Sequence, residues 1–260
     1  MIKGIDMTEI NQVYNEDCLI GIKRIPDKSI DMILCDLPYG TTHCKWDSII
    51  PLNLLWEQYE RIIKDNGAIA LTAQSPFSEV LAVSKLDLFR YRWVWEKTEA
   101  TGHLNSKKMP MKAHEDILIF YKKLPTYNPI KTQGHERKTA SQNRSLQKNN
   151  HYGKMVDAIT TYDSTERYPR SVLRFAKEKQ CMNLHPTQKP VALFEYLVLT
   201  YTNKGDTVLD NCMGSGTTAE VCIKNDRNFI GFENDVEHGF YNIILERIEK
   251  AKKDKYIISI

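Results

Sequence analysis

The stretch of sequence that decides the fold is Thr207-Val208-Leu209-Asp210-Asn211-Cys212-Met213-Gly214-Ser215-Gly216-Thr217-Thr218-Ala219. It opens as a short β-branched strand, passes through two glycines and enters a helix-forming run that continues to Lys224. A second predicted strand, residues 229–232, ends in Glu233. Glycines at such a bend let a ligand approach the backbone closely, and the start of the helix offers unpaired N–H groups. This order of elements predicts a nucleotide-cofactor site in an α/β domain.

The residue that ends the first strand narrows the class of cofactor. Gly214-Ser215-Gly216-Thr217-Thr218-Ala219 fits the G-x-G-x-x-A dinucleotide fingerprint, so an NAD-dependent dehydrogenase is one alternative. Asp210 stands directly before the loop, where a carboxylate would repel a pyrophosphate and attract an ammonium group. S-adenosylmethionine carries an ammonium, a carboxylate and a ribose, and no phosphate. Asp210 therefore favours S-adenosylmethionine, and Glu233, about 20 residues past the glycines, is placed to bind the ribose.

A second motif, Asp36-Leu37-Pro38-Tyr39, stands far upstream and follows an apolar run at 30–35 that predicts a buried strand. The Asp36 carboxylate and the Leu37 carbonyl can each accept one N–H of a planar amine. Pro38 restricts Leu37 to extended conformations and so aims that carbonyl, and Tyr39 offers a ring on which a base can stack. A tetrapeptide of this kind also occurs in ordinary turns, and the glycine motif downstream is what favours a site.

With both motifs present, the chain resembles the amino-group DNA methyltransferases of the permuted β class, which are mostly adenine-N6 enzymes of bacteria and phages. In that family the catalytic D-P-P-Y comes first and the cofactor glycines come last. Three further segments carry the resemblance: an acidic segment at 14–18, a strand at 111–120, and His-Pro-Thr-Gln-Lys-Pro at 185–190. Leu37 departs from the family's proline, and Asn211-Cys212 departs from its Pro-Phe, which leaves the loop's contacts to the methionine end of the cofactor open.

The resemblance implies a site-specific transfer of a methyl group from S-adenosylmethionine to N6 of an adenine flipped out of double-stranded DNA. It implies that Asp17 accepts from the cofactor adenine, that the Cys18 N–H donates to its ring, and that Lys189 pairs with the cofactor carboxylate. The implied catalytic residues are Asp36, Leu37, Pro38 and Tyr39. The implied cofactor site comprises Asp17, Cys18, Asp36, Lys189, Asp210, Cys212, Gly214, Gly216, Thr217, Thr218 and Glu233.

Two other functions stay open beside the dehydrogenase. One is a cytosine-N4 DNA methyltransferase; the family's cytosine members more often carry serine where Asp36 stands, which favours adenine. The other is a catalytically silent DNA-binding regulator, against which the intact Asp36 and glycine loop argue. His185 is expected to be structural, and His43 and Trp46 follow the catalytic turn, where they pack or gate the pocket. Cytosine-C5 chemistry is disfavoured because no Pro-Cys nucleophile is present.

The composition, with 42% hydrophobic and 27% charged residues among 260, is ordinary for a globular protein in water. No apolar run approaches about 18 residues, so no membrane span is expected, and the N-terminus lacks a signal-peptide core. Six cysteines without a C-x-x-C pair indicate reduced thiols in the cytoplasm, where the protein would associate with the nucleoid through DNA. No His/Cys cluster has zinc spacing, so no metal is predicted. A homodimer and a cognate restriction enzyme stay open.

Positive charge is concentrated in one part of the chain. Residues 122–179 hold 13 lysines and arginines against 5 acids, a balance of +8, although the whole chain carries only +3. Tyrosines are interleaved with these cations, a combination that suits phosphate contacts and base stacking. The family carries its target-recognition region at this place. We therefore expect a catalytic half at 1–124, a target-recognition insert at 125–180 and a cofactor-binding half at 181–260. The expected DNA contacts are Arg137, Lys138, Arg144 and Lys148.

Strand and helix patterns alternate on both sides of this insert. The pattern predicts helices at 18–25, 76–85, 190–202 and 235–253, and one from residue 52 to a C-cap at Asn66-Gly67. It predicts a mobile loop at 98–111. Alternation of this kind indicates a mostly parallel, doubly wound sheet covered on both faces, here a circularly permuted Rossmann-like methyltransferase fold. Only the family resemblance places the strands that end in Asp36 and Asp210 side by side.

Overall fold

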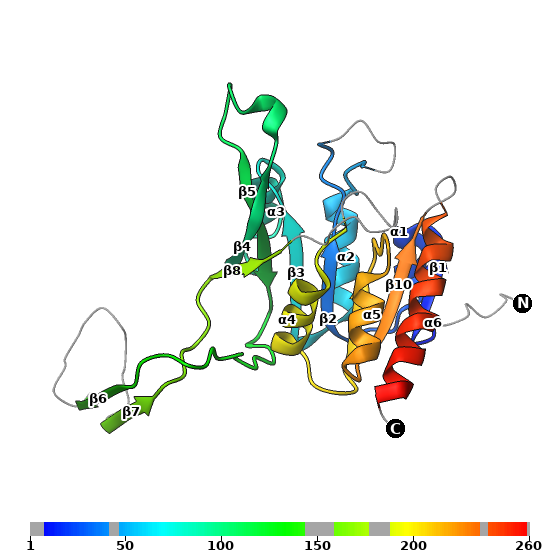
Figure 1. The fold of residues 1–260 in the computed structure, drawn as a ribbon. Coiled ribbons are helices and arrows are strands. Elements are labelled where there is room, and N and C mark those ends of the chain that lie inside the picture. Colours follow the sequence, from blue (N-terminus) through cyan, green and yellow to red (C-terminus); the bar gives the residue numbers. More distant parts are fainter. Residues whose placement is uncertain (1–7, 42–46, 144–158, 177–187, 235–238, 259–260) are drawn as a thin grey trace, which may run out of the picture. The chain divides into compact units, whose positions relative to one another are not determined.

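The fold is built on one mixed sheet, shown as a ribbon in Figure 1, and the computed structural model describes residues 8–41, 47–143, 159–176, 188–234 and 239–258. Eight strands lie side by side in the order β1-β10-β9-β2-β3-β5-β4-β8. Their bounds, in that spatial order, are Gln12–Asn15, Asn228–Glu233, Thr207–Asp210, Ile30–Asp36, Ile63–Ala73, Lys112–Phe120, Phe89–Thr101 and Val172–Phe175.

Parallel pairing dominates the sheet. β1, β10, β9, β2 and β3 pair in parallel, and β8 pairs in parallel with β4. Only β5 runs against its neighbours β3 and β4. β4 therefore points the same way as β2 and β3, and the carboxyl ends of all three lie at one edge of the sheet. The predicted mostly parallel α/β fold is confirmed.

Helices cover both faces, as the alternation of strands and helices predicts. Side chains at alternate positions of each strand enter one of two apolar clusters, because successive residues of a strand point to opposite faces. In β2, Ile33 and Cys35 join the cluster beneath α1 (Cys18–Gly21), α2 (Leu52–Ile62) and α3 (Phe77–Ser84). Met32 and Leu34 join the cluster beneath α4 (Val191–Tyr201), α5 (Thr217–Lys224) and α6 (Phe240–Ile258).

The winding of the chain reverses between β9 and β2. The β9–α5–β10 unit places its helix on one face and the β2–α2–β3 unit places its helix on the other. β9 and β2 are nevertheless direct neighbours, with Met32 opposite Val208 and Ile33 opposite Leu209. In open α/β sheets the crevice outside such a switch point is where ligands bind. The structure thus confirms the adjacency that the sequence patterns alone do not reveal.

One helix end differs from the prediction. α2 ends at Ile62, because Ile63 adopts an extended conformation and begins β3, so Asn66-Gly67 lies inside a strand and not at a helix C-cap. The glycine has a different reason to be there. The pairing of β3 with β2 shifts register between Ile30 and Met32, and a Cβ on Gly67 would lie 2.8 Å from the Asp31 carbonyl oxygen. A glycine at such an irregularity lets two strands approach closely.

Other boundaries move by smaller amounts. The first helix is a single turn, followed by a 3₁₀ turn at Ile22–Arg24. β4 continues to Thr101, so part of the segment predicted as a loop at 98–111 is strand. α6 begins at Phe240, later than predicted, and residues 235–238 lie outside the described residues. β8 was not predicted; it returns part of the basic segment to the edge of the main sheet.

A second compact unit spans Pro129–Arg170. Its described core is an antiparallel hairpin of β6 (Lys138–Asn143) and β7 (Ile159–Ser164), with Lys138 opposite Ser164. Below the hairpin, Thr132 and Arg167 exchange backbone hydrogen bonds of 2.9 and 3.0 Å. The first unit comprises the remaining residues, 1–128 and 171–260.

Among the residues that the structure describes, no helix is long and apolar enough to span a bilayer.

Candidate active site

Asp36 ends β2 at the edge of the sheet where the parallel strands terminate. Both of its carboxylate oxygens are engaged. Oδ1 accepts from the Tyr39 hydroxyl at 2.7 Å and from the hydroxyl of Thr72, the residue directly opposite on β3. Oδ2 accepts from Lys189 Nζ at 2.7 Å. The carboxylate is therefore held in one orientation by three donors, yet its side chain remains 24% exposed.

The rest of the predicted tetrapeptide shapes the turn after the strand. The Leu37 side chain is buried, which leaves its backbone as the part that can serve a ligand. Pro38 and Tyr39 are half-buried. The Tyr39 ring stacks on Phe77 with centroids 5.5 Å apart and planes 26° apart, so one face is already occupied by protein. Its hydroxyl contacts Asp36, a role that the sequence analysis does not foresee.

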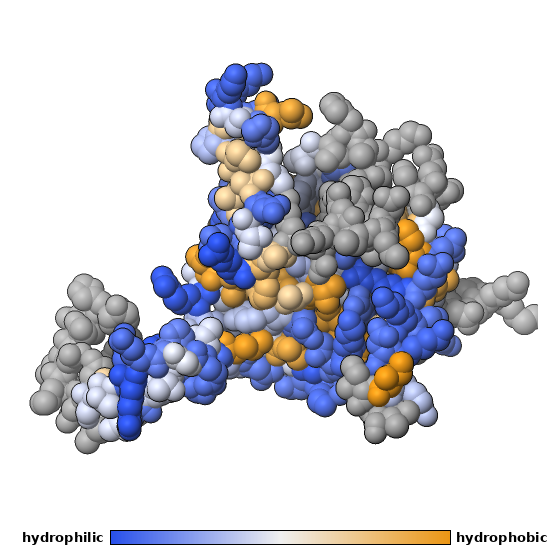
Figure 2. Space-filling view, viewed as in Figure 1, coloured by the Kyte–Doolittle hydropathy of each residue, from blue (hydrophilic) through white to orange (hydrophobic). Residues whose placement is uncertain are grey.

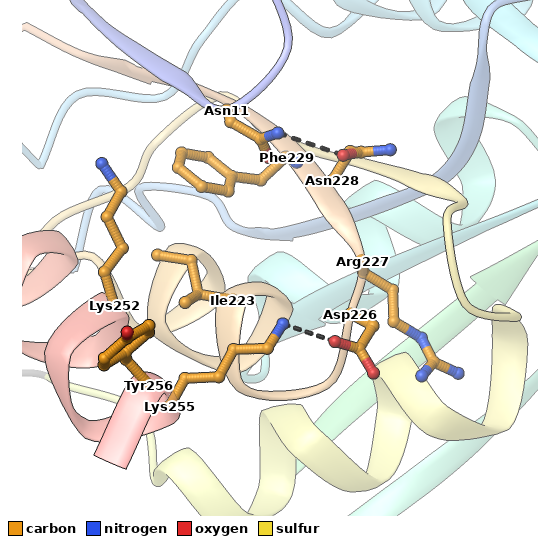
Figure 3. A pocket seen from close by; sticks show the side chains of 9 residues that line it. All are labelled: Asn11, Ile223, Asp226, Arg227, Asn228, Phe229, Lys252, Lys255 and Tyr256. Atoms are coloured by element: carbon orange, nitrogen blue, oxygen red, sulfur yellow. Dashed lines mark hydrogen bonds and ion pairs between the residues drawn. The ribbon is translucent and has the colours of Figure 1, made fainter. Parts of the chain in front are cut away.

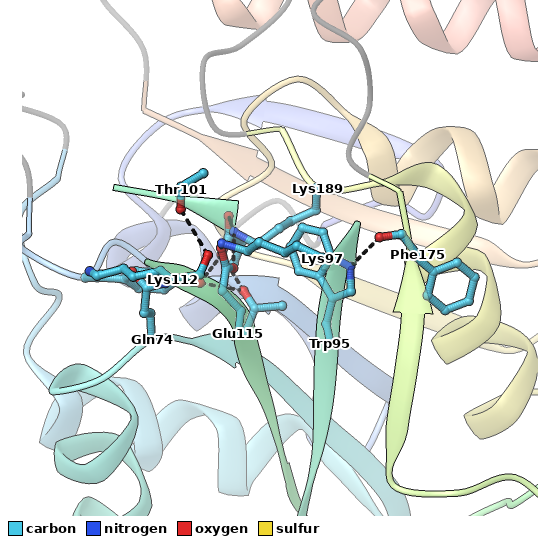
Figure 4. A network of polar contacts seen from close by, with 11 residues as sticks. Gln74, Trp95, Lys97, Thr101, Lys112, Glu115, Phe175 and Lys189 are labelled. Atoms are coloured by element: carbon cyan, nitrogen blue, oxygen red, sulfur yellow. Dashed lines mark hydrogen bonds and ion pairs between the residues drawn. The ribbon is translucent and has the colours of Figure 1, made fainter. Parts of the chain in front are cut away.

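A row of alternating charges runs from Asp36 through Lys189 and Glu115 to Lys97, and Figure 4 labels the last three of these residues. Lys189 Nζ lies 2.7 Å from Asp36 and 3.3 Å from Glu115 Oε2, and Glu115 Oε1 lies 2.6 Å from Lys97 Nζ. The side chains of Lys97 and Lys189 are only 3% and 7% exposed. Two cations thus alternate with two anions, and the group is neutral as a whole, which is the condition for keeping charges out of water.

The pKa shifts follow from this arrangement. Burial opposes the ionisation of Glu115, yet the ammonium groups of Lys189 and Lys97 lower its pKa below the usual value. Burial also opposes the charge on Lys189, but Asp36, Tyr39 and Glu115 raise the pKa of its ammonium well above the usual value. Glu115 Oε2 is buried and accepts no hydrogen bond, although Lys189 stands beside it. The lysine therefore directs its hydrogen bond to Asp36 and keeps Glu115 as a second counter-ion.

The glycine loop lies between β9 and α5, next to the strand that carries Asp36. Gly214 and Gly216 adopt left-handed backbone conformations with φ of 56° and 83°, which favour glycine. Nothing lies within 4 Å of where a Cβ on Gly214 would stand. The Gly214 N–H donates to Glu233 Oε2 at 2.6 Å, so the acid that ends β10 reaches the loop. The glycine loop and Glu233, which the sequence assigns to the same cofactor site, are therefore in direct contact.

Asp210 is almost fully buried beneath this loop. It accepts from the Cys212 N–H at 3.1 Å and from the Thr218 hydroxyl at 2.5 Å. These two bonds do not offset the loss of water, and burial raises the pKa of Asp210 to about 6. A cationic ligand beside this carboxyl would favour its ionised form.

The residues that replace the family's Pro-Phe make a polar contact beneath the loop. Asn211 is buried, accepts from the Tyr59 hydroxyl and donates to the sulfur atoms of Cys18 and Cys212 at 3.7 and 3.4 Å. Asp17 caps α1 by accepting from the Leu19 N–H at 2.7 Å. The first helix is thereby joined to the cofactor loop, and Asp17 and Cys18 stand next to β10, on which Glu233 lies.

The start of α5 is held by an arginine. Arg247 Nη1 donates to the Ser215 carbonyl at 3.1 Å and to the Thr217 hydroxyl at 3.2 Å. Ser215 in turn donates to Gln188 Oε1 at 3.1 Å, and Gln188 directly precedes Lys189. One short segment before α4 therefore touches both the glycine loop and the Asp36 carboxylate.

These residues fit S-adenosylmethionine. The open space at Gly214 leaves room against the backbone, the buried Asp210 suits an ammonium group, and Glu233 at the end of the neighbouring strand suits the hydroxyls of a ribose. Lys189 forms an ion pair with Asp36 in this structure, so its predicted pairing with a cofactor carboxylate stays a prediction. Among the residues that the structure describes, no cluster of His, Cys, Asp or Glu could hold a metal ion.

The predicted DNA contacts lie in the second unit. Arg137 makes a two-point ion pair with Asp163, with Nε–Oδ1 and Nη2–Oδ2 distances of 2.7 and 2.6 Å, and Lys138 is exposed. Arg144 and Lys148 lie outside the described residues, as do His43, Trp46 and His185.

A hollow of about 510 Å³ lies away from this site (Figure 3). Its lining includes Asn11 and Asn228, which stand at the amino ends of β1 and β10, together with Lys252 and Lys255 of α6. The site residues stand at the carboxyl ends of the strands, at the opposite edge of the sheet. The hollow therefore takes no part in the site.

Comparison with known proteins agrees with this geometry. The sequence model of a DNA methylase family, named for N6 and N4 methyltransferases, matches residues 30–245. The chain belongs to this family. As a family member it is a DNA methyltransferase that acts on an amino group and uses S-adenosylmethionine as the methyl donor. The resemblance inferred from the two motifs is confirmed.

Named relatives cover nearly the whole methyltransferase. The type II methyltransferase M1.MboII of Moraxella bovis is 27% identical over 94% of this chain and 99% of its own. The DNA adenine methyltransferase YhdJ of Escherichia coli strain K12 is 30% identical over 88% of this chain and 80% of its own.

Solved structures share the fold. The crystal structure of an M1.HpyAVI–SAM complex superposes with a TM-score of 0.60 at 23% identity and covers 91% of this methyltransferase and 98% of its own chain. The cytosine-N4-specific PvuII DNA methyltransferase superposes with a TM-score of 0.64 at 15% identity, over 96% and 93% of the two chains.

Sequence reasoning missed Thr72, Glu115 and Lys97 as members of the methyltransferase site. Lys97 could have been found from its strand, because Trp93, Trp95 and Lys97 share one face at a spacing of two and both tryptophans are buried. A lysine at the third position of such a row must have a counter-ion. Thr72 gave no comparable signal, since its role depends on which residue the sheet places opposite.

The alternating charges make a stability prediction. Glu115→Gln should cost about 3–5 kcal/mol, because it leaves Lys97 buried without its counter-ion. Lys97→Met together with Glu115→Gln removes both charges and should cost less than Glu115→Gln alone. Urea unfolding of the two variants and the wild type measures this. A double variant less stable than the single one would contradict the pairing.

Proposed function

We propose that the protein methylates N6 of adenine in double-stranded DNA at a specific sequence. The observation that carries this proposal is Asp36, an aspartate with one edge toward solvent at the end of β2, beside the strand that leads into the glycine loop. The family's cytosine-N4 members more often carry serine at this place. The relative YhdJ is named as an adenine methyltransferase, which also supports adenine.

The chain's residues would prepare the amine. The lone pair of an exocyclic amine is delocalised into the ring, so the nitrogen is a poor nucleophile. Hydrogen bonds from its N–H groups to the Asp36 carboxylate and the Leu37 carbonyl favour a tetrahedral nitrogen with a free lone pair. S-adenosylmethionine supplies the electrophilic methyl group when bound. Asp36 then stabilises the ammonium product until it loses its proton, and positioning contributes much of the rate.

The contacts of Asp36 imply a competition. Its oxygens are taken by Lys189, Tyr39 and Thr72 in this structure, so an incoming amine must displace at least one of them. Lys189 is the donor that can leave with least cost, because Glu115 already stands 3.3 Å from its ammonium and can keep it neutralised. Lys189 released in this way is free to pair with the cofactor carboxylate, as the family resemblance implies.

The unit at Pro129–Arg170, within the predicted insert 125–180, is proposed to recognise the target sequence. The unit holds eight lysines and arginines against four acids, a balance of +4 out of the +8 carried by residues 122–179, and this positive charge supports the role. Its described cations are partly paired inside the unit, as Arg137 with Asp163 and Lys131 with Glu166 at 2.9 Å. A homodimer and a cognate restriction enzyme remain predictions.

The base that is methylated can be identified directly. DNA from a host that expresses the protein should contain N6-methyladenine, and mass spectrometry of its nucleosides separates this product from N4-methylcytosine. Methylation-sensitive long-read sequencing then gives the target sequence. Asp36→Ala should lower the methylation rate about 100- to 1000-fold, because one transition-state hydrogen bond is lost. N4-methylcytosine as the product, or a variant within threefold of wild type, would contradict the assignment.

Cofactor affinity should depend on pH through Asp210. Its pKa in the folded protein is about 6, and a bound ammonium favours the carboxylate, so protons compete with the cofactor. Affinity for S-adenosylmethionine should fall as the pH drops from 7 to 5, by up to about tenfold per unit below the pKa. The cofactor's own amino group stays protonated in this range. Calorimetry should find weaker and pH-independent binding for Asp210→Asn, and equal wild-type affinity at pH 5 and 7 would remove Asp210 from the site.

The role of the insert can be tested by exchange. Replacing residues 129–170 with the equivalent unit of a relative that methylates another sequence should transfer that relative's target choice, because the catalytic and cofactor residues lie outside the unit. Binding of S-adenosylmethionine by the chimera serves as the control for folding. A chimera that binds cofactor and still methylates the original sequence would place recognition elsewhere.

A further inference from the structure

The hairpin of β4 and β5 extends past the edge of the sheet that carries Asp36 (Figure 1). Asp36 lies opposite Thr72, Thr72 opposite Ile117, and Ile117 opposite Trp93, so these four residues stand at one level across the sheet. β4 then continues for eight residues to Thr101. At about 3.3 Å per residue the end of β4 lies as much as about 26 Å beyond the level of the Asp36 carboxylate, and the tip follows it.

Beyond Lys97 the hairpin is a two-stranded ribbon. The pairing of β8 with β4 ends at Lys97, and the pairing of β3 with β5 ends at Asp116. Every residue from Gly102 to His114 is exposed. A two-stranded β-ribbon is one of the two protein elements that the major groove of DNA admits.

The tip is an ordered turn that presents an apolar side chain. Gly102 adopts a left-handed conformation, and backbone hydrogen bonds of 2.8–3.0 Å close the turns from Gly102 to Met109. Leu104, on the first of these turns, is 98% exposed. Figure 2 shows an apolar group standing out at the tip of the hairpin among hydrophilic residues. Within the described part of the chain, this leucine has no apolar surface to pack on.

Charge indicates what the tip meets. Beyond Lys97, from Thr98 to His114, the ribbon holds three lysines, at 107, 108 and 112, and one acid, Glu99. Single exposed leucines are common on protein surfaces. Leu104, however, stands on an ordered cationic ribbon at the edge of the sheet where the target base must arrive. Lysines and an apolar side chain together suit a nucleic-acid duplex, which has anionic phosphates outside and stacked bases inside.

We propose that the β4–β5 tip enters the target duplex and that Leu104 occupies the gap left in the stack by the flipped base, while Lys107 and Lys108 contact phosphates. The proposal rests on the proposed function, since it needs a duplex substrate whose base leaves the stack. Extruding a base costs unstacking and unpairing, and apolar wedges such as leucine are the side chains that proteins insert between base steps. Leu104 would favour the extruded state without touching the reacting atoms.

The experiment compares two duplexes that carry the mapped target sequence, one fully paired and one with an abasic site opposite the target base. Leu104→Ala should lower kcat/KM on the paired duplex about tenfold. On the abasic duplex, where the base is already unpaired, the loss should shrink to within about twofold, and Leu104→Phe should stay near wild type on both. Leu124→Ala is the matched control, because Leu124 is 78% exposed and follows β5 at the opposite edge of the sheet.

Salt dependence tests the two lysines separately. Lys107→Ala and Lys108→Ala should each reduce the log–log slope of DNA affinity against salt by about 0.9. The proposed insertion of Leu104 would be overturned if Leu104→Ala lowered kcat/KM equally on both duplexes, or did not lower it on the paired duplex. A change in the oligomeric state of the free variant would overturn it as well. If the wild type methylates neither duplex, the proposed function is overturned, and the proposed insertion of Leu104 with it.

Discussion

The parallel pairing of β2 with β9 is the constraint on which the site depends. Only Met32 with Val208 and Ile33 with Leu209 make this pairing, yet it joins strands from opposite ends of the chain. Both strands end in an aspartate whose chemistry differs with its surroundings. Asp36 keeps an edge toward solvent and three donors, whereas Asp210 is buried and its pKa is raised to about 6. Under the proposed function, neighbouring strands thus supply one carboxylate for the target amine and another for the cofactor.

The charges behind Asp36 show how an ion pair can be kept ready for exchange. A lysine bound to a single buried carboxylate would be costly to move, because its departure would leave both charges without a partner. Glu115 changes that balance by standing beside Lys189, and Lys97 neutralises Glu115 in turn. The lysine can then leave Asp36 without becoming an isolated buried charge. The buried charges of Glu115 and Lys97 therefore serve the exchange of Lys189 between partners, in addition to the stability of the fold.

The sequence predicted the parts of the site that depend on neighbours along the chain. Asp36, Asp210 and Glu233 each end a strand and the two glycines follow one. The edge at which the strands end is determined once the sheet is mostly parallel. Contacts between distant segments could not be predicted from pattern. Thr72 meets Asp36 because of strand register, and Lys189 meets it because α4 packs where it does. The C-cap predicted at Asn66-Gly67 was wrong, because a helix cap and a close approach of two strands both favour glycine.

The adjacency of Gln188 and Lys189 limits how the sequence of this enzyme can change during evolution. Two successive side chains reach different structures: Gln188 contacts Ser215 of the glycine loop and Lys189 contacts Asp36. Inserting or deleting one residue here would misplace both contacts at once, whereas the hairpin tip and the second unit can vary in length without disturbing either. Under the proposed function, target choice is therefore free to vary in those parts, while the segments that carry Asp36 and the glycine loop must be inherited together.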